Sequence, residues 1–320
     1  MSAVGTAAAG SVVMVDVANA GEVVAVDSWA RGSGLSVLAV HNDAMEIFLG
    51  RLDDVSSIPS DRMPGTRVWF YTNFHCNLAC DYCCAMSSPR SDPLMLPAPL
   101  VARLVDEAMS LGAREFFLTG GEPFLHPELD RIVESCAAAA PTLLLTNGML
   151  LRGSRLQLLL RLPRENLILQ VSLDSPTAQR HDRHRGEGSW AKAVAGIKTA
   201  RDAGFAVRLA ATLGSEASGD DVALAEMCAD LGLDPQDTVV RRVAQQGAAT
   251  DGIVLSRATL VPEICVSGRG VHWHPVAPMD EAMLVTTDIS SLAPAVDAVR
   301  QEYLGYRRRG DVLAATFPCA

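Results

Sequence analysis

Residues 115–146 read EFFLTGGEPFLHPELDRIVESCAAAAPTLLLT, two short apolar runs on either side of one longer amphipathic segment. The runs at 115–119 and 142–146 predict strands, and residues 126–139 predict the helix between them. Because both runs are continuously apolar rather than alternating, they are typical of parallel strands that are buried on both faces. This stretch therefore predicts one βαβ unit.

The same alternation extends over residues 67–243 with a period of about 30 residues. Strands are predicted at 67–73, 115–119, 142–146, 167–173, 206–212 and 238–243, and helices at 96–111, 126–139, 154–162, 189–203 and 220–231. Six such units predict an α/β fold, a partial (β/α)6 barrel of the TIM type. Active residues of such barrels lie in the loops after the strands, so we expect the functional site there.

Two further segments flank the predicted core of residues 67–250. Residues 1–66 are an N-terminal β-rich segment and linker, in which EVVAVDSW, LSVLAVHN and MEIFLGRL predict strands joined by hairpin turns. Residues 251–320, where the alternation fades, are a predicted C-terminal extension. Within that extension, residues 262–275 have the pattern of a β-hairpin.

Charge and apolar content limit the partners of this chain. Its 320 residues carry 27 Lys and Arg against 37 Asp and Glu, a formal net charge of −10, so no global basic field holds nucleic acid or an anionic membrane. No uninterrupted apolar stretch reaches the roughly 18 residues that span a bilayer. No Lys or Arg precedes Arg31, as it would in a signal peptide. We therefore expect a cytoplasmic protein with neither a nucleic-acid nor a membrane partner.

Four of the eight cysteines fall within nine residues, directly after the first predicted barrel strand: Cys76, Cys80, Cys83 and Cys84. A secreted disulfide framework would spread its cysteines more evenly, so the cluster favours metal binding or redox chemistry. Three thiolates at this spacing suit an iron–sulfur cluster. Structural zinc, which would recruit His75 or Cys84 as a fourth ligand, is the main alternative.

The spacing Cys76-x3-Cys80-x2-Cys83, with Tyr82 before the third cysteine, resembles the signature of the radical S-adenosylmethionine (radical SAM) superfamily. The resemblance implies that Cys76, Cys80 and Cys83 bind three irons of a [4Fe-4S] cluster, whose fourth iron binds the amino and carboxylate groups of SAM. Tyr82 would then lie against the adenine of SAM. Cys84 is an extra cysteine, which we expect to point away from the cluster.

A glycine pair ends the second predicted strand, in Thr119-Gly120-Gly121-Glu122-Pro123. Taken alone, this is an ordinary turn that only glycine permits. One βα unit after the cysteines, it resembles the GGEP motif of the superfamily. The resemblance implies that Gly120, Gly121 and Glu122 contact the methionine amine of SAM.

The next two strand ends carry further polar motifs, which alone could be helix caps. In series they resemble the TNG and SLD...HDxxRG elements of the superfamily, at Thr146-Asn147-Gly148, Ser172-Leu173-Asp174 and His181-Asp182-Arg183-His184-Arg185-Gly186. The resemblance implies that Ser172 and Arg185 bind the SAM carboxylate, with Asp174 or Asn147 nearby. A guanidinium suits that role because it meets a carboxylate in bidentate fashion.

The resemblance implies an enzyme with a [4Fe-4S] cluster and SAM as cofactors. An electron from a reductant of flavodoxin or ferredoxin type would cleave SAM to a 5'-deoxyadenosyl radical, which abstracts a hydrogen atom from the substrate. We expect a small natural product that is epimerised or oxidised, because the first 60 residues lack the winged-helix pattern of a leader-peptide-binding domain. Modification of a ribosomal peptide is the alternative, and a non-catalytic zinc-binding protein is a third hypothesis.

The C-terminal extension vaguely resembles the start of a SPASM or twitch domain, and so could be a degenerate cap of that kind. An auxiliary cluster needs about four thiolates. Only Cys228, Cys265 and Cys319 lie beyond residue 200. Their spacing matches no cluster motif, so a single cluster is expected.

Cys265 is the predicted catalytic residue. The weak S–H bond of a lone thiol can return a hydrogen atom to a substrate radical, as radical SAM epimerases do, and Cys319 and Cys84 are competing donors. The structural alternative is that Cys265 is a small buried hydrophobe. His272 and His274 are candidate substrate contacts or general bases, although lone histidines are more often structural.

Overall fold

The computed structural model describes residues 12–19, 22–23, 25–26, 36–41, 46–50, 63–213, 220–234, 238–258 and 260–309. The chain divides into two compact units. The first comprises Met1–Pro64, Leu255–Pro262 and Val296–Phe317, and the second comprises Gly65–Val254, Glu263–Ala295 and Pro318–Ala320. The second unit holds every motif that resembles the superfamily. No helix of the described residues is long and apolar enough to cross a membrane.

A nine-stranded sheet in the order β12-β11-β10-β4-β5-β6-β7-β8-β9 forms the second unit. Every neighbouring pair from β10 to β9 is parallel. The strands that carry the motifs and their neighbours are β4 (Arg67–Tyr71), β5 (Glu115–Thr119), β6 (Thr142–Thr146), β7 (Leu167–Ser172), β8 (Ala206–Leu213) and β9 (Val239–Arg242). The edge strands β9 and β12 do not pair with each other in the described residues. The barrel is therefore partial, as predicted.

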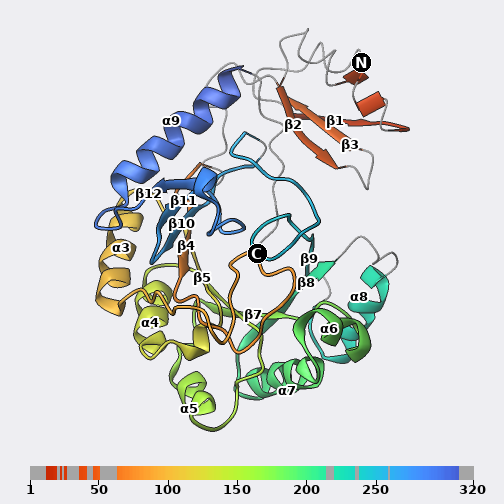
Figure 1. Cartoon of the computed structure of the whole chain (residues 1–320), viewed down its shortest axis with the longest axis vertical. Helices are drawn as coiled ribbons and strands as arrows, with labels where there is room; N and C mark the ends of the chain where they lie inside the picture. The colour runs from red at the N-terminus through yellow and green to blue at the C-terminus, as the bar shows by residue number, and fades with distance from the viewer. Residues whose placement is uncertain are drawn as a thin grey trace. The chain divides into compact units, whose positions relative to one another are not determined.

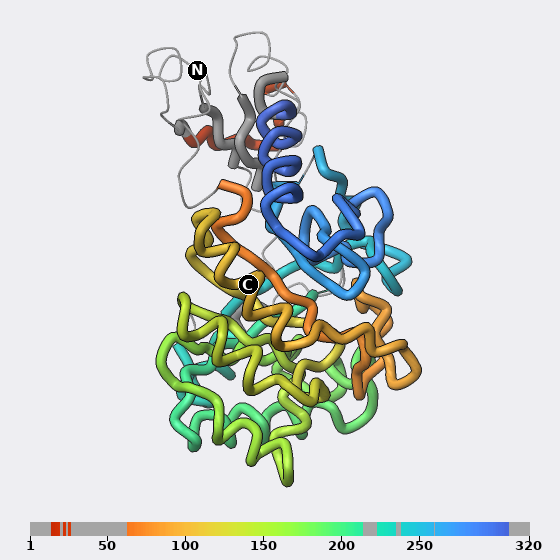
Figure 2. The backbone as a smooth tube through the Cα atoms, turned by 90° about the vertical axis from the view of Figure 1, so that its left-hand side faces the viewer, coloured from red at the N-terminus to blue at the C-terminus, as the bar shows by residue number. Residues whose placement is uncertain are grey.

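Helices follow the strands and lie on the outside of the curved sheet (Figure 1). They are α3 (Ala98–Ser110), α4 (Leu129–Ala139), α5 (Gly153–Arg161), α6 (Ala178–Arg185), α7 (Ser189–Asp202) and α8 (Asp220–Asp230). Figure 2 shows α3, α4 and α5, coloured gold to green, on the near side of the strands. Every predicted core strand and helix is present, with bounds that differ by at most three residues. Only α6 among these helices was not predicted.

One face of the sheet is lined by aromatic and apolar side chains. Trp69 and Tyr71 of β4 pack with Phe117 of β5, Leu143 of β6 and Cys265 in one buried cluster. The rings of Trp69 and Phe117 are stacked, with centroids 4.3 Å apart. Because alternate residues of a strand point to opposite faces, these side chains mark the inner face of the barrel.

Three strands near the C-terminus extend this sheet: β10 (Ile264–Ser267), β11 (Gly270–His272) and β12 (Leu284–Thr286). The predicted hairpin is confirmed, since β10 and β11 are antiparallel and Cys265 lies opposite His272. In addition, β10 is a parallel neighbour of β4, with Cys265 beside Trp69. Part of the predicted C-terminal extension thus belongs to the barrel sheet. It is followed by an unpredicted helix, α9 (Ala293–Arg309).

The first unit contains a three-stranded antiparallel sheet in the order β1-β3-β2. Its strands are β1 (Val12–Asp16), β2 (Ser36–His41) and β3 (Glu46–Gly50), so the second and third predicted strands are confirmed. The prediction of a strand at EVVAVDSW is wrong, since residues 22–23 and 25–26 are helical. The Asn19 side chain accepts from Glu22 N and the Glu22 carboxylate accepts from Ala18 N. This reciprocal arrangement resembles a capping box, which starts a helix.

Candidate functional site

The loops that carry the predicted motifs follow the carboxyl ends of β4, β5, β6 and β7, where barrel sites are expected. The loop after β4, residues 72–97, holds the four clustered cysteines and is called the cysteine loop here. Backbone hydrogen bonds join its start to the GGEP turn: Gly121 N donates to Asn73 O at 2.8 Å and Glu122 N donates to His75 O at 3.0 Å. The loops that carry the first two motifs are therefore bonded directly to each other.

The two glycines of the GGEP turn are required by this close approach. A Cβ on Gly120 would lie 2.5 Å from Asn73 O, and a Cβ on Gly121 would lie 2.3 Å from His75 O. Gly120 also has a φ of +153°, which side chains disfavour. The structure thus gives both glycines a packing role between the two loops.

Glu122 is fully buried, and both of its carboxylate oxygens accept hydrogen bonds. The donors are Thr146 Oγ1 at 2.8 Å, Asn147 N at 2.9 Å and Phe124 N at 3.1 Å. Burial raises the pKa of Glu122, while these three donors act in the opposite direction. In this structure the carboxylate of Glu122 therefore ties the end of β5 to the end of β6.

Asn147 reaches from the end of β6 into the cysteine loop. Its Nδ2 donates to Asn77 Oδ1 at 2.8 Å and lies 4.0 Å from the sulfur of Cys76. Its Oδ1 accepts from Met149 N at 3.0 Å, which fixes the orientation of the amide. The TNG motif is thus placed beside the first of the clustered cysteines.

The three cysteines of the signature lie close enough to influence one another. Burial and then neighbouring negative charges, including the other two thiols, raise the pKa of Cys76 to about 12. Burial also raises the pKa of Cys80, to about 11. The sulfur of Cys83 accepts from Ser87 N at 3.3 Å. Among the described residues, no three His, Cys, Asp or Glu side chains are grouped around the position of a single metal ion.

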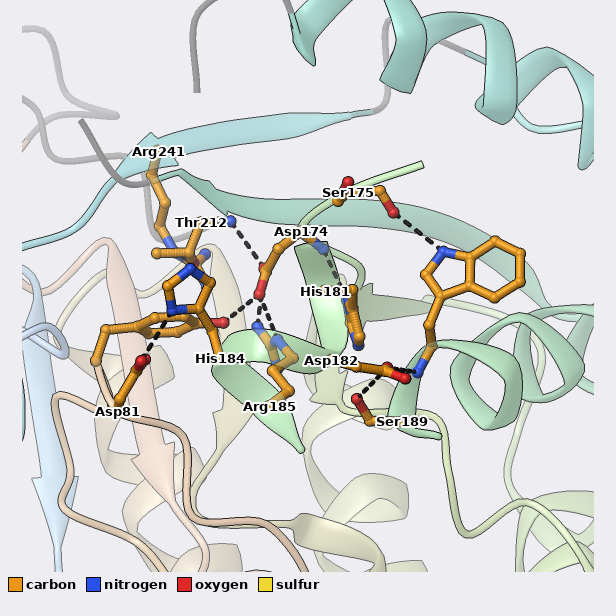
Figure 3. A network of polar contacts seen from close by, with 12 residues as sticks. Asp81, Asp174, Ser175, His181, Asp182, His184, Arg185, Ser189, Thr212 and Arg241 are labelled. Atoms are coloured by element: carbon orange, nitrogen blue, oxygen red, sulfur yellow. Dashed lines mark hydrogen bonds and ion pairs between the residues drawn. The ribbon is translucent and has the colours of Figure 1, made fainter. Parts of the chain in front are cut away.

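Asp174 and Arg185 form a buried bidentate ion pair, drawn in Figure 3. Arg185 Nε lies 2.5 Å from Asp174 Oδ2 and Nη2 lies 3.0 Å from Oδ1. The Tyr82 hydroxyl also donates to Oδ2, and Thr212 N donates to Oδ1 at 3.0 Å. Burial raises the pKa of Asp174, but Arg185 and the hydrogen bonds from Tyr82 and Thr212 together hold that pKa below its ordinary value. Three predicted site residues, Tyr82, Asp174 and Arg185, thus lie in direct contact.

The HDxxRG motif forms helix α6, which presents three residues at helical spacing toward this network. His181 Nδ1 accepts from Asp174 N at 3.2 Å, and His184 Nδ1 lies 2.9 Å from Asp81 Oδ2 in the cysteine loop (Figure 3). The positions 181, 184 and 185 share one helix face because they are separated by three and four residues. That spacing is the sequence signal by which α6 could have been found.

The remaining predicted residues have different environments. Ser172 is half-buried at the end of β7, beside Ala210 of β8. Cys265 is fully buried on the inner face, in a cluster that also contains Ala85 of the cysteine loop. Cys83 packs against this cluster. Cys319 lies outside the described residues.

Sequence reasoning missed the loop after β9, which packs on the cysteine loop. Ala248 N donates to Cys83 O at 3.0 Å. A Cβ on Gly247 would lie 2.4 Å from the carbonyl oxygens of both Cys83 and Cys84, and its φ of +61° favours glycine. The only sequence signal was a lone glycine, which resembles no motif.

Comparisons with known proteins agree with this arrangement. A family model described as the radical SAM superfamily matches residues 71–227. The antilisterial bacteriocin subtilosin biosynthesis protein AlbA of Bacillus subtilis is 35% identical over 117 residues, which cover 36% of this chain and 26% of AlbA. A GTP 3',8-cyclase of Microcystis aeruginosa is 43% identical over 99 residues, which cover 30% of each chain. The match therefore spans less than a third of either relative.

Solved structures with a similar fold include two that contain S-adenosylmethionine. SuiB of Streptococcus suis has a TM-score of 0.51 at 19% identity, covering 62% of this chain and 45% of SuiB. The protein anSMEcpe has a TM-score of 0.55 at 12% identity, covering 74% of this chain and 79% of its own. At such identities the likeness shows the fold alone.

The matched region begins at the end of β4 and ends within α8, so it holds the cysteine loop, the GGEP turn, the TNG and SLD loops and α6. Motif order, barrel architecture and family match all agree. The chain belongs to the radical SAM superfamily, whose enzymes use a [4Fe-4S] cluster and S-adenosylmethionine.

Proposed function

We propose that this chain is a radical SAM enzyme that abstracts a hydrogen atom from a small natural product, which it epimerises or oxidises. The proposal is carried by one observation: loops from four neighbouring parallel strands meet at one end of the barrel. There Asn147 bonds to Asn77, and Tyr82 bonds to Asp174. The carboxyl ends of barrel strands are where cofactor-binding groups are expected, so this convergence supports the proposal.

The donor set fits an iron–sulfur cluster. Cys76, Cys80 and Cys83 share one loop, and burial together with neighbouring thiols raises the pKa of Cys76 and that of Cys80, a shift that a positive iron centre bound to them would reverse. In a cubane each cysteine binds its own iron, so the three sulfurs do not have to converge on one point. These three residues are the proposed cluster ligands.

Arg185 offers the clearest fit to the carboxylate of SAM. Its Nε and Nη2 atoms bond to Asp174, and no described residue accepts a hydrogen bond from Nη1. A held guanidinium with one free edge is suited to bind a further carboxylate. The proposed SAM-binding residues are Tyr82, Gly120, Gly121, Glu122, Asn147, Ser172, Asp174 and Arg185. Because Glu122, Asn147 and Asp174 already have hydrogen-bond partners, their part is mainly to hold the loops.

The cluster and SAM, when bound, supply a radical that removes a hydrogen atom from a C–H bond of the substrate. The chain supplies a dry inner face, on which Trp69 and Phe117 are almost fully buried. Cys265 lies on that face beneath the cysteine loop, where in an epimerisation its thiol donates a hydrogen atom to the substrate radical. Its sulfur then recovers one electron from an external reductant and one proton from solvent.

A ribosomal peptide is the second candidate substrate. The similarity to AlbA, a bacteriocin biosynthesis protein, favours it, and so does the fold shared with SuiB, which has been crystallised with the precursor peptide SuiA. The two candidates differ in product mass. Incubation of the reduced enzyme with a bacterial small-molecule extract and with candidate precursor peptides, followed by mass spectrometry, separates them.

Anaerobic reconstitution tests the proposed cofactor chemistry. We expect a brown protein with about four irons per chain. A variant with alanine at positions 76, 80 and 83 should lose the colour and the iron. Colourless protein that retains stoichiometric zinc would contradict the proposal, and about eight irons would contradict a single cluster.

Cys265→Ala tests the hydrogen donor. The variant should still cleave SAM but yield a different product, because the substrate radical is no longer quenched by the thiol. Cys136→Ala is a matched control, since Cys136 is equally buried but lies in α4 on the outside of the sheet. Unchanged product from Cys265→Ala would remove Cys265 as donor.

A further inference from the structure

We propose that Asp174 is a positioning residue that clasps the cysteine loop, through Tyr82, to β7 and α6, and so fixes the position of Cys80. The inference rests on the proposed function only in taking Cys80 as a cluster ligand. The contacts that carry it are drawn in Figure 3.

The carboxylate of Asp174 is a junction of three separate segments. It accepts two hydrogen bonds from Arg185 of α6, one from Tyr82 of the cysteine loop and one from Thr212 of β8. Both oxygens are used twice, so the carboxylate cannot turn without losing a bond. Tyr82 therefore meets an acceptor whose position is fixed by the barrel.

Burial makes this junction strong. The side chains of Arg185 and Asp174 are only 8% and 5% exposed. Charge-assisted hydrogen bonds are stronger than neutral ones, and water competes little for them at such a site. The bond from the Tyr82 hydroxyl accordingly constrains the cysteine loop more than a surface contact would.

A second, weaker contact holds the residue before Tyr82. Asp81 N donates to His184 O at 3.3 Å, and Asp81 Oδ2 lies 2.9 Å from His184 Nδ1. These two side chains are exposed, so their contact contributes little by itself. Together the two contacts fix both residues that follow Cys80.

Cys80 depends on this clasp more than the other two signature cysteines do. The sulfur of Cys76 accepts from Leu78 N, and that of Cys83 accepts from Ser87 N. None of the hydrogen bonds between described residues reaches the sulfur of Cys80. Its position therefore follows from the backbone around it, which Tyr82 and Asp81 hold in place.

The test measures thiol reactivity in the iron-free full-length protein. Site-resolved mass spectrometry gives the alkylation rate of each cysteine with iodoacetamide. Tyr82→Phe keeps the ring but removes the hydroxyl. Loss of a hydrogen bond to a charged group should make Cys80 about tenfold more reactive. Cys76 and Cys83 should change less than about twofold, because their sulfurs keep their own hydrogen-bond donors.

Two further variants frame this result. His184→Ala removes the exposed contact with Asp81 and the tilted ring contact with Tyr82, but it keeps the bond from Tyr82 to Asp174, so Cys80 should become about twofold more reactive. Ser189→Ala is the matched control, because the Ser189 hydroxyl also donates to an aspartate of the same network, Asp182, at 2.9 Å. It should leave the reactivity of Cys80 unchanged, since Asp182 does not contact the cysteine loop in the described structure.

Iron-binding measurements keep this proposal separate from the proposed function. After reconstitution, Tyr82→Phe should lose iron to a chelator several-fold faster than Ser189→Ala. Equal Cys80 reactivity in Tyr82→Phe and Ser189→Ala would overturn the clasp. If the wild-type chain bound no iron, the proposed function would fail, while the alkylation rates would still decide whether the clasp exists. If Tyr82→Phe did not fold, the rate of His184→Ala against the control would decide.

Discussion

At the scale of single residues, backbone atoms decide how closely two loops can approach. The GGEP turn lies against the start of the cysteine loop with no room for a side-chain carbon at Gly121. The atom it would meet is His75 O, a backbone oxygen that cannot swing away like the end of a long side chain. Glycine is therefore needed at this position for packing, quite apart from any contact with a cofactor.

Gly121→Ala should lower the free energy of unfolding by about 3 kcal/mol, because overpacking forces the backbone to shift. Urea denaturation followed by circular dichroism measures the change. Gly112→Ala is the control: its φ of +97° is strained for alanine, but its Cβ would have no atom within 4 Å. That variant should cost only about 1 kcal/mol. If both variants lost the same free energy of unfolding, the close approach of Gly121 to His75 O would not contribute to stability.

Glu122 shows what a motif can and cannot predict about a residue. The sequence singled out its position only because the turn lies one βα unit after the cysteines and there resembles the GGEP motif. Its partners, Thr146 and Asn147, come from the next βα unit. Which donors occupy a carboxylate depends on how two loops pack, and no local pattern encodes that.

At the scale of elements, β10 is the strand whose place in the sheet was not predicted. Glu263 directly precedes β10, and its contacts explain why β10 lies beside β4. Its carboxylate bonds to Arg67 at 2.5 Å and also to the indole of Trp69, both on β4. The hairpin of β10 and β11 is a local feature that the sequence predicted, whereas this pairing joins residues 196 positions apart. Such a long-range pair leaves no periodic signal.

Glu263→Gln should lower the free energy of unfolding by about 2 kcal/mol, because it leaves the charge of Arg67 without its closest, largely buried partner. Glu115→Gln is a matched control on the same guanidinium. The Glu115 carboxylate lies 3.4 Å from Arg67, and its side chain is 46% exposed. That variant should cost less than about 1 kcal/mol. If both substitutions had the same effect in urea denaturation, Glu263 would not be what secures β10.

At the N-terminal helical residues, the prediction failed although it rested on a local pattern. EVVAV has strong strand propensity, yet a helix begins there, where the Asn19 side chain accepts from Glu22 N and the Glu22 carboxylate accepts from Ala18 N. Strand propensity is context-dependent, and a satisfied helix start outweighed it here. The signal N-x-x-E is present in the sequence at residues 19–22, directly before the run of valines.

At the scale of the whole molecule, the sequence predicted the barrel well because its strands and helices are local, periodic features. It also placed Tyr82, Asp174 and Arg185 in one site, since motifs that follow parallel strands must meet at one edge of the sheet. It did not predict that these three residues bind one another. Their contacts cross from one loop to another, and the motif alone indicated only a shared neighbourhood.

Buried histidines spread through the second unit link its stability to pH. Burial lowers the pKa of His181 to about 4, that of His272 to about 4 and that of His274 to about 3. All three are at most 2% exposed. Nδ1 of His272 has no hydrogen-bond partner among the described residues, so no acceptor is in place at that atom for an added proton. The folded state therefore holds these three imidazoles neutral.

This predicts that the free energy of unfolding falls as the pH decreases from about 6.5 to about 4. In that window the unfolded chain binds protons that the folded chain does not, and each histidine contributes up to about 1.4 kcal/mol per pH unit. The buried carboxyls of Glu122 and Glu263, whose pKa burial raises, act in the opposite sense. The contribution of a single histidine is therefore best isolated by comparing variants.

His274→Gln should reduce the pH dependence by about one proton, because a residue with a depressed pKa no longer takes up its proton on unfolding. Urea denaturation at pH 7, 6 and 5 gives the slope of the free energy of unfolding against pH for each protein. The stability that the substitution costs at pH 7 shifts the whole curve and does not enter the slope. A slope equal to that of the wild type in His274→Gln would mean that His274 is already protonated in the folded barrel.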